Sequence, residues 1–375
     1  MLYKKCQIIV LIPIFLFHVV TSFAQQRDSR VREYLSPTRI VWQQESQLIQ
    51  GAEYLLRPGH GQTNLVNNEL CKLSSTEQKH PAILFDFGKE LQGGLQIVTG
   101  MPASHAPVTI RVRLGESVSE AMCDIDEVNG ATNDHAMRDF VISVPWLGVL
   151  EVGNSGFRFA RIDLLDDSAE LHLKEIRAIS VYQDIPYKGS FRCNDERLNR
   201  IWQTGAYTVH LNMQDYIWDG IKRDRLVWIR DLHPEVMTVN TVFGYNEVIP
   251  KSLDLIRDST PLPQWMTMCT YSLWWILIQR DWYLYQGNLD YLKEQKGHLC
   301  DLLQLIMTRI GEDGLEKFND DEGRFLDWPS CENPLAINAG VQALVIQAMK
   351  AGYELCSVLG EDMLATKCEA VRRKM

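Results

Sequence analysis

The stretch Asp219-Gly-Ile-Lys-Arg-Asp-Arg-Leu-Val-Trp-Ile-Arg-Asp-Leu-His-Pro-Glu235 decides how the rest of the chain is interpreted. It interleaves carboxylates with a lysine, arginines and a tryptophan, and Trp218 precedes it directly. Gly220 and Pro234 are typical of loops and element ends, so we do not expect one continuous helix here. The carboxylates of the stretch are Asp219, Asp224, Asp231 and Glu235.

This mixture predicts the wall of a polar cleft. A buried core would not take so many charges unpaired, and a solvated surface would not interleave tryptophans. Carboxylates beside aromatic faces are what a sugar-cleaving site needs, because a carboxyl group handles the glycosidic oxygen or water and indole faces receive the apolar faces of sugar rings. The alternative is a structural ion-pair network at a helix junction.

The same stretch resembles a motif of bacterial α-L-rhamnosidases, Asp-Cys-Pro-x-Arg-Asp-Glu-Arg-x-Gly-Trp-x-Gly-Asp. A related subgroup reads Asp-Gly-x-Lys-Arg-Asp-Arg-x-x-Trp-x-Gly-Asp, which this chain follows from Asp219 to Asp231. Residues 85–94 resemble the jelly-roll domain of that family, and residues 190–202 resemble the first helix of its (α/α)6 barrel. The resemblance extends from about residue 80 to the C-terminus.

The resemblance implies an inverting glycosidase that needs no cofactor or metal. The family's general acid is the Glu after Arg-Asp, but Arg225 stands there, so Asp224 becomes the candidate general acid and Glu235 the fallback. Arg230 replaces the usual Gly. The expected sugar-binding residues are Asp219, Arg223, Trp228, Asp231, Asp327 and Trp328.

The N-terminus predicts export. Two lysines precede an apolar run from Ile8 to Val20, and a small residue, Ala24, ends the segment before Gln25. This is the pattern of a signal peptide over residues 1–24, and the apolar run is too short to span a membrane. We therefore expect a periplasmic or secreted protein that is not membrane-bound after cleavage.

Charge and cysteine content exclude several classes. A net charge of −10 and a pI near 5.4 argue against nucleic acid or anionic membrane as partners. They point to no particular substrate, so the expected carbohydrate partner rests on the motif and on the resemblance. Eight cysteines follow the signal segment without a Cys-x-x-Cys pair, which argues against a zinc site. Several lie in apolar helical stretches and are expected to be buried thiols, with one or two disulfides left open.

From residue 81 to 188 the hydrophobic period is two, as in half-buried strands. This predicts an antiparallel β-sandwich or jelly roll, preceded by a lead-in segment over residues 25–80. The alternating Arg111, Arg113, Arg158 and Arg161 indicate a solvent face or, alternatively, a carbohydrate-binding face. An acidic loop at 124–127 indicates a solvated turn rather than a Ca²⁺ site. The six expected strands are residues 82–87, 95–99, 108–114, 140–144, 157–164 and 176–181.

From residue 189 the pattern becomes helical, which predicts a helical barrel or toroid over 189–375. Asn194 or Asp195 caps the first helix, and a long polar loop is expected over 311–334. That loop contains Asp327-Trp328, which resembles an Asp-Trp pair of the rhamnosidase sugar pocket. The expected helices are 195–209, 236–256, 267–286, 288–310 and 335–359, and one from about residue 362.

About six helices are expected where an (α/α)6 barrel has twelve, so the sequence predicts the N-terminal half of a barrel, with the family's second catalytic Glu absent. The leading hypothesis is an exported α-L-rhamnosidase that removes terminal α-L-rhamnose, with activity in doubt for a half barrel. The alternative is a degenerate carbohydrate-binding protein. A third hypothesis is another toroid enzyme such as a lyase, with Tyr216, Tyr245 or His233 as base.

Overall fold

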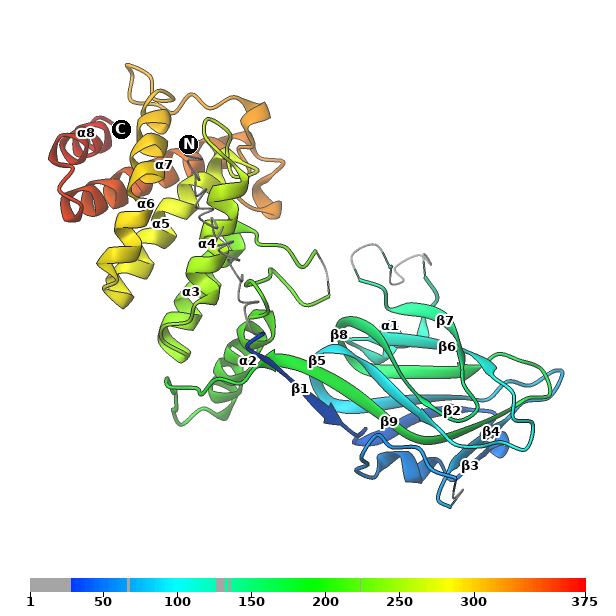
Figure 1. Ribbon diagram of the computed structural model, residues 1–375. Coiled ribbons are helices and arrows are strands. Elements are labelled where there is room, and N and C mark those ends of the chain that lie inside the picture. Colours follow the sequence, from blue (N-terminus) through cyan, green and yellow to red (C-terminus); the bar gives the residue numbers. More distant parts are fainter. Residues whose placement is uncertain (1–27, 66–67, 126–131, 134–135, 223) are drawn as a thin grey trace, which may run out of the picture.

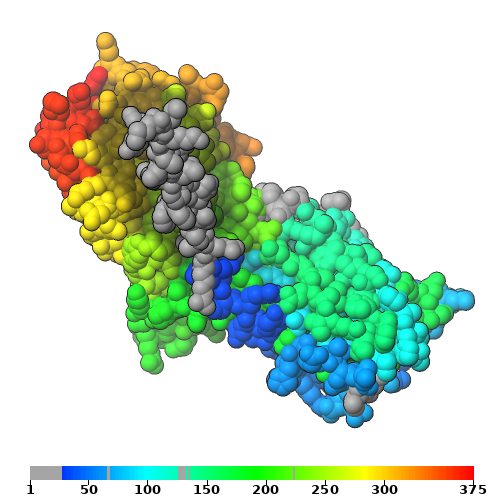
Figure 2. Space-filling model, viewed as in Figure 1, coloured from blue at the N-terminus to red at the C-terminus, as the bar shows by residue number. Residues whose placement is uncertain are grey.

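A computed structural model describes residues 28–65, 68–125, 132–133, 136–222 and 224–375. An antiparallel β body is followed by a helical body, and the two lie at opposite ends of an elongated molecule (Figures 1 and 2). This order confirms the expected fold class of antiparallel β structure followed by helices. The predicted signal segment lies outside the described residues. The strands are β1 (Arg30–Leu35), β2 (Arg39–Gln44), β3 (Ile49–Gln50), β4 (Cys71–Ser74), β5 (Ala82–Thr99), β6 (Val108–Gly115), β7 (Asp139–Val144), β8 (Val149–Leu164) and β9 (Glu170–Gln183).

Hydrogen bonds join the strands in the order β3-β4-β9-β5-β8-β6-β7, with β1 beside β9 and β2 beside β5. The long strand β5 pairs with β8 along one edge. Its other edge pairs with β2 over residues 82–86 and with β9 over residues 93–99. The sheet therefore divides along β5. Alternate apolar side chains of these strands, among them Phe85, Ile97 and Phe157, form the core of the β body.

Strand β5 differs from expectation, because residues 82–87 and 95–99 were predicted as separate strands. The intervening residues stay in the strand through irregular pairing with β8, where the register shifts between Asp86 and Leu91. Gly88, with φ of +83°, supplies a backbone conformation that other residues rarely adopt. Residues 30–74, described from the sequence as a lead-in, supply β1 to β4 of the same sheet.

The prediction that the alternating arginines face solvent is wrong for Arg113 and Arg161, whereas Arg111 and Arg158 are partly exposed. Arg113 and Arg161 are only 3% and 8% exposed, and both pair with Asp163. Arg158 pairs with Asp86, which is 1% exposed. The Arg113 and Arg161 guanidinium groups are buried because the Asp163 carboxylate on the sheet satisfies them, whereas Arg158 stays partly exposed.

The helical body begins with α2, where the Asp195 side chain accepts a hydrogen bond from the Arg197 amide as predicted for a cap. Residues 236–256, expected as one helix, form two, since Gly244 takes a positive φ and Asn246 accepts a hydrogen bond from the Val248 amide. The helices are α1 (Val118–Met122, within the β body), α2 (Glu196–Asn212), α3 (Ile229–Val242), α4 (Val248–Ser259), α5 (Cys269–Gln286), α6 (Leu289–Met307), α7 (Pro334–Val358) and α8 (Asp362–Lys374).

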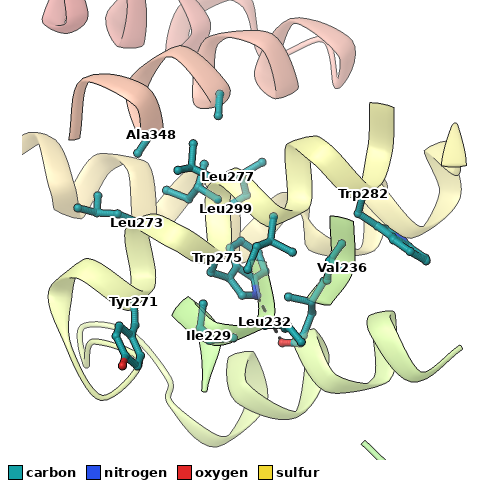
Figure 3. Close-up of a cluster of buried hydrophobic side chains, with 14 of the residues drawn as sticks. Ile229, Leu232, Val236, Tyr271, Leu273, Trp275, Leu277, Trp282, Leu299 and Ala348 are labelled. Carbon is teal, nitrogen blue, oxygen red and sulfur yellow. Dashed lines mark hydrogen bonds between the residues drawn. The ribbon is translucent and has the colours of Figure 1, made fainter. Parts of the chain in front are cut away.

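Helix α5 lies at the centre of the helical core. Its Trp275 is fully buried, packs near Leu232 and Val236 of α3, and donates a hydrogen bond of 3.4 Å from Nε1 to the Leu253 carbonyl (Figure 3). Cys269, Cys356 and the other cysteines among the described residues are free thiols. In the described part of the chain, no helix combines the length and apolarity needed to cross a membrane.

Candidate active site

Helix α3 brings two of the predicted carboxylates together. It begins at Ile229, so Asp231 and Glu235 lie one turn apart on one face, as their spacing predicts. Pro234 lies inside this helix, although the sequence indicated an element end there. The two carboxylates line a pocket of about 330 Å³, together with Asp219, Arg230, His233, Pro234 and Trp274.

Glu235 is the most enclosed acid of the pocket, at 7% exposed. Burial, with smaller contributions from Asp231 and Asp219, raises the pKa of Glu235 to about 8, although a hydrogen bond from Asn212 acts in the opposite direction. The Asn212 Nδ2 donates to Glu235 Oε1 at 2.8 Å from the end of α2. Glu235 therefore carries a proton at neutral pH, which suits a proton donor.

Asp219 and Asp231 are less enclosed. Burial and the neighbouring carboxylates of Asp224 and Asp231 raise the pKa of Asp219 to about 6, although the Leu226 amide donates to it. Burial also raises the pKa of Asp231. Like charges gathered in one pocket favour the protonated forms of its members.

Asp224 lies in the loop between α2 and α3 and is oriented by an aromatic side chain. The Trp228 Nε1 donates to Asp224 Oδ2 at 3.0 Å, and the Trp228 ring packs edge-on to Tyr271 with centroids 5.9 Å apart. Asp224 and Arg225 have φ of 46° and 55°, a left-handed conformation that costs about 1 kcal/mol or more for such residues. Strain of this kind is common at functional sites.

The second predicted loop reaches the first. Arg230 Nη2 lies 3.3 Å from Asp327 Oδ2, so the arginine that replaces the family's glycine joins the first turn of α3 to the second loop. The Asp327 side chain also accepts a hydrogen bond from the Trp328 amide. Trp328 is 76% exposed and packs edge-on to Phe325, which leaves most of its ring open.

Other predicted residues take different places. Arg223 lies outside the described residues. Trp218, which precedes the motif, lies under the Arg225 guanidinium. Tyr216 and Tyr245, considered as lyase bases, line a separate pocket of about 870 Å³ whose side chains include Asp254 and other acids. An acid-lined pocket does not suit a uronate.

A hydrogen-bonded pair that was not predicted from the sequence borders the pocket. His233 Nε2 lies 3.0 Å from Asp281 Oδ2, and its ring packs against Trp274 at 4.9 Å. Burial opposes ionisation of Asp281, yet hydrogen bonds with His233 and Arg280 bring the net pKa below its usual value. The sequence signal for this pair is Asp281, the only acidic residue in the apolar helix α5, because a buried acid requires a partner.

Comparison with known proteins identifies the helical body. Residues 186–372 match the family described as the bacterial α-L-rhamnosidase six-hairpin glycosidase domain. The matched residues run from α2 to all but the end of α8. In this six-hairpin domain the pocket lies at the start of α3, beside the loop that carries the matched motif.

Solved structures share the fold over most of this chain. A rhamnosidase from Klebsiella oxytoca, solved with rhamnose bound, aligns with a TM-score of 0.75 and 18% identity, covering 93% of this chain and 70% of its own. A GH78 family rhamnosidase of Bacillus sp. GL1 aligns with a TM-score of 0.68 and 21% identity, covering 86% of this chain. The present chain spans 33% of that protein's length. A search of curated proteins found no match.

Across the residues that the structure describes, no cluster of His, Cys, Asp and Glu side chains is arranged to hold a metal ion. In the predicted acidic loop at 124–127, Asp124 pairs with Arg111.

Proposed function

We propose that this protein is a glycoside hydrolase of the α-L-rhamnosidase type that removes terminal α-L-rhamnose with inversion of configuration. The observation that carries the proposal is the pocket lined by Asp219, Asp231 and Glu235 inside the six-hairpin domain. Carboxylates accept hydrogen bonds from sugar hydroxyls, and a protonated carboxyl group donates to the departing glycosidic oxygen.

Within this proposal, Asp224 is the candidate general acid because Trp228 fixes its carboxylate beside the pocket acids. Glu235 is the second candidate, since its raised pKa keeps it protonated at neutral pH. Asp219, Asp231 and Asp327, with Arg223, hold sugar hydroxyls. Trp228 and the exposed Trp328 offer ring faces for stacking.

The decisive experiment compares two leaving groups. We expect Asp224→Asn to lower turnover of methyl α-L-rhamnoside by about 10²–10⁴-fold, because a poor leaving group needs the proton. Turnover of p-nitrophenyl α-L-rhamnoside should fall much less, since p-nitrophenolate leaves without one. NMR of the first-formed sugar reports the anomeric configuration.

The matched control is Asp215→Asn, which removes a half-exposed carboxylate paired with Arg30 and should leave both rates unchanged. If Asp224→Asn also leaves them unchanged, Asp224 is not the acid, and the same comparison on Glu235→Gln tests the second candidate. A folded wild-type protein that hydrolyses neither rhamnoside overturns the proposed activity.

A non-catalytic carbohydrate-binding protein is the second candidate function. It is favoured by Arg225, which stands where the family has its acid, and by the Arg230–Asp327 pair, which engages a carboxylate expected to bind sugar. Calorimetric binding of L-rhamnose without turnover of either rhamnoside supports this alternative.

We also propose that the protein acts outside the cytoplasm, on the strength of the signal-peptide pattern over residues 1–24. Mass spectrometry of the exported protein should show a mature chain that begins at Gln25. A chain retaining Met1 in the cell contradicts this.

A further inference from the structure

The loop that carries Asp224 is closed at its base within the helical body. The Asp219 amide donates to the Leu226 carbonyl at 3.0 Å, and the Leu226 amide returns a hydrogen bond to Asp219 Oδ1 at 2.9 Å. Figure 1 shows this loop, between α2 and α3, extending toward the β body. Its outer residues therefore need support from elsewhere.

Strand β8 makes an apolar contact with the loop. Ile221 is buried at 7% exposed, and Gly156 of β8 lies directly beneath it. A Cβ on Gly156 would lie 2.7 Å from Ile221 Cγ1 and 3.3 Å from Lys222 Cβ. The absence of a side chain at position 156 thus lets the loop approach the sheet closely.

Lys222 adds an electrostatic contact from the same loop to the β body. Its Nζ lies 2.9 Å from Glu116 Oε2 and 2.9 Å from Glu120 Oε1, and the Glu120 side chain is only 13% exposed. Burial and a hydrogen bond with Glu116 raise the pKa of the adjacent Glu90 to about 8, so Glu90 stays protonated at neutral pH. The ammonium group therefore faces two carboxylates in a partly enclosed setting, where ion pairs are stronger than on an open surface.

A third contact lies on the other side of Asp224. Arg225 Nη1 donates to the Asn154 carbonyl of β8 at 2.9 Å. Asp224 thus lies between two cations that bind the β body, while its own carboxylate accepts from Trp228 of the helical body. The left-handed backbone at Asp224 and Arg225 is maintained by contacts on both sides.

We propose that Lys222, through Glu116 and Glu120 of the β body, is a positioning residue that holds Asp224 in its catalytic orientation. The catalytic role of Lys222 rests on the proposed function. The ion-pair contact of Lys222 with Glu116 and Glu120, called the clamp below, does not. A misplacement of about 1 Å at a reacting group costs about 10²-fold in rate, so a loosened loop should slow turnover more than it weakens binding.

The test is Lys222→Met, which keeps the aliphatic stem and removes the charge. We expect kcat on methyl α-L-rhamnoside to fall about ten- to a hundredfold while KM changes less than threefold. Hydrogen–deuterium exchange at Asp224 to Leu226 should accelerate about tenfold or more. Lys222→Arg should keep most of the wild-type kcat and most of the slow exchange in the loop, since a guanidinium still reaches two carboxylates.

Two further variants make the test specific. Gly156→Val, on the opposite body, should accelerate exchange in the same loop by displacing Ile221. Lys293→Met removes an exposed pair with Asp290 on α6 and should change neither readout. If Lys222→Met misfolds, Glu116→Gln provides the milder perturbation.

The outcomes separate the two proposals. Unchanged exchange at Asp224 to Leu226 in Lys222→Met overturns the clamp, whether or not the wild type is active. Accelerated exchange with unchanged kcat overturns the catalytic part. A wild type without rhamnosidase activity overturns the proposed function alone, and the exchange experiment still decides the clamp.

Discussion

Glu235 is a carboxyl group that the fold encloses beside other acids. Its pKa of about 8 exceeds the ordinary value of 4.5 mainly because burial disfavours the charged form. A group whose pKa is raised in the folded state contributes fully to the free energy of unfolding below its unfolded-state pKa. That contribution is lost as the pH rises through its folded-state pKa. The wild-type protein should therefore lose stability between about pH 4.5 and pH 8.

Glu235→Gln should remove this pH dependence, because the amide has no proton to lose. The slope from one such group is at most about 1.4 kcal/mol per pH unit. Urea unfolding of the helical body should be measured at pH 5, 6, 7 and 8. As the pH rises, the free energy of unfolding of the variant should increase relative to that of the wild type. The exposed Glu312→Gln should follow the wild type. Parallel curves for Glu235→Gln and the wild type would mean that Glu235 ionises normally.

The sequence could predict local parts of the site but not its distant partners. Asp231 and Glu235 were placed on one helix face by their spacing alone, and Asp327 was singled out by its resemblance. Asn212 and Asp281 come from α2 and α5, so only folding brings them to the pocket. Arg113 illustrates the opposite error, because alternation does not reveal that Asp163 lies beside it.

Helix α3 packs into the helical core with one face and lines the pocket with another. Leu232, at 1% exposed, packs into the helical core near Trp275, whereas Asp231 lines the pocket (Figure 3). The helix is anchored by its apolar face, so the position of the acids depends on that packing.

Leu232→Ala should therefore lower the free energy of unfolding by about 2–5 kcal/mol, through lost burial and the cavity left behind. Thr241→Ala, at an exposed position of the same helix, should change it by less than about 0.5 kcal/mol. Chemical denaturation of both variants measures the difference. Equal stability of the two variants would show that α3 is not anchored through Leu232.

Element boundaries were predictable where a cap or glycine marks them. Asp195 gave the start of α2, and Gly287, with φ of 65°, follows the end of α5. Gly244 was equally available as a stop signal between α3 and α4, but the apolar residues around it suggested continuity. The irregular centre of β5 had no such local signal, since its pairing with β8 is set by residues about 70 positions away.

Among the described residues, each body has one large hydrophobic core of its own, and the β body also contains a small cluster around Leu84, Ala121 and Phe159. Polar contacts cross between the bodies, including Tyr207 to the Glu90 carbonyl at 2.6 Å and His210 to the Gln183 carbonyl at 2.6 Å. Bodies joined by polar contacts rather than by a shared core commonly unfold as separate units.

Calorimetry should accordingly show two thermal transitions. Leu232→Ala should lower the temperature of only the transition that belongs to the helical body. The far-ultraviolet circular dichroism spectrum, recorded through each transition, assigns the transition to helix or sheet. A single transition, shifted as a whole by Leu232→Ala, would show that the two bodies unfold cooperatively.

The pairing of β1 with β9 has a consequence for biosynthesis. Arg30 lies opposite Gln183, so the first described strand emerges from the ribosome about 150 residues before its partner. At roughly 5–20 residues per second, that strand edge stays unpaired for about 10–30 s. The edge of β1 is therefore exposed to chaperones and to aggregation for well over a third of the chain's synthesis, and the sheet closes only after translation has reached the linker to α2.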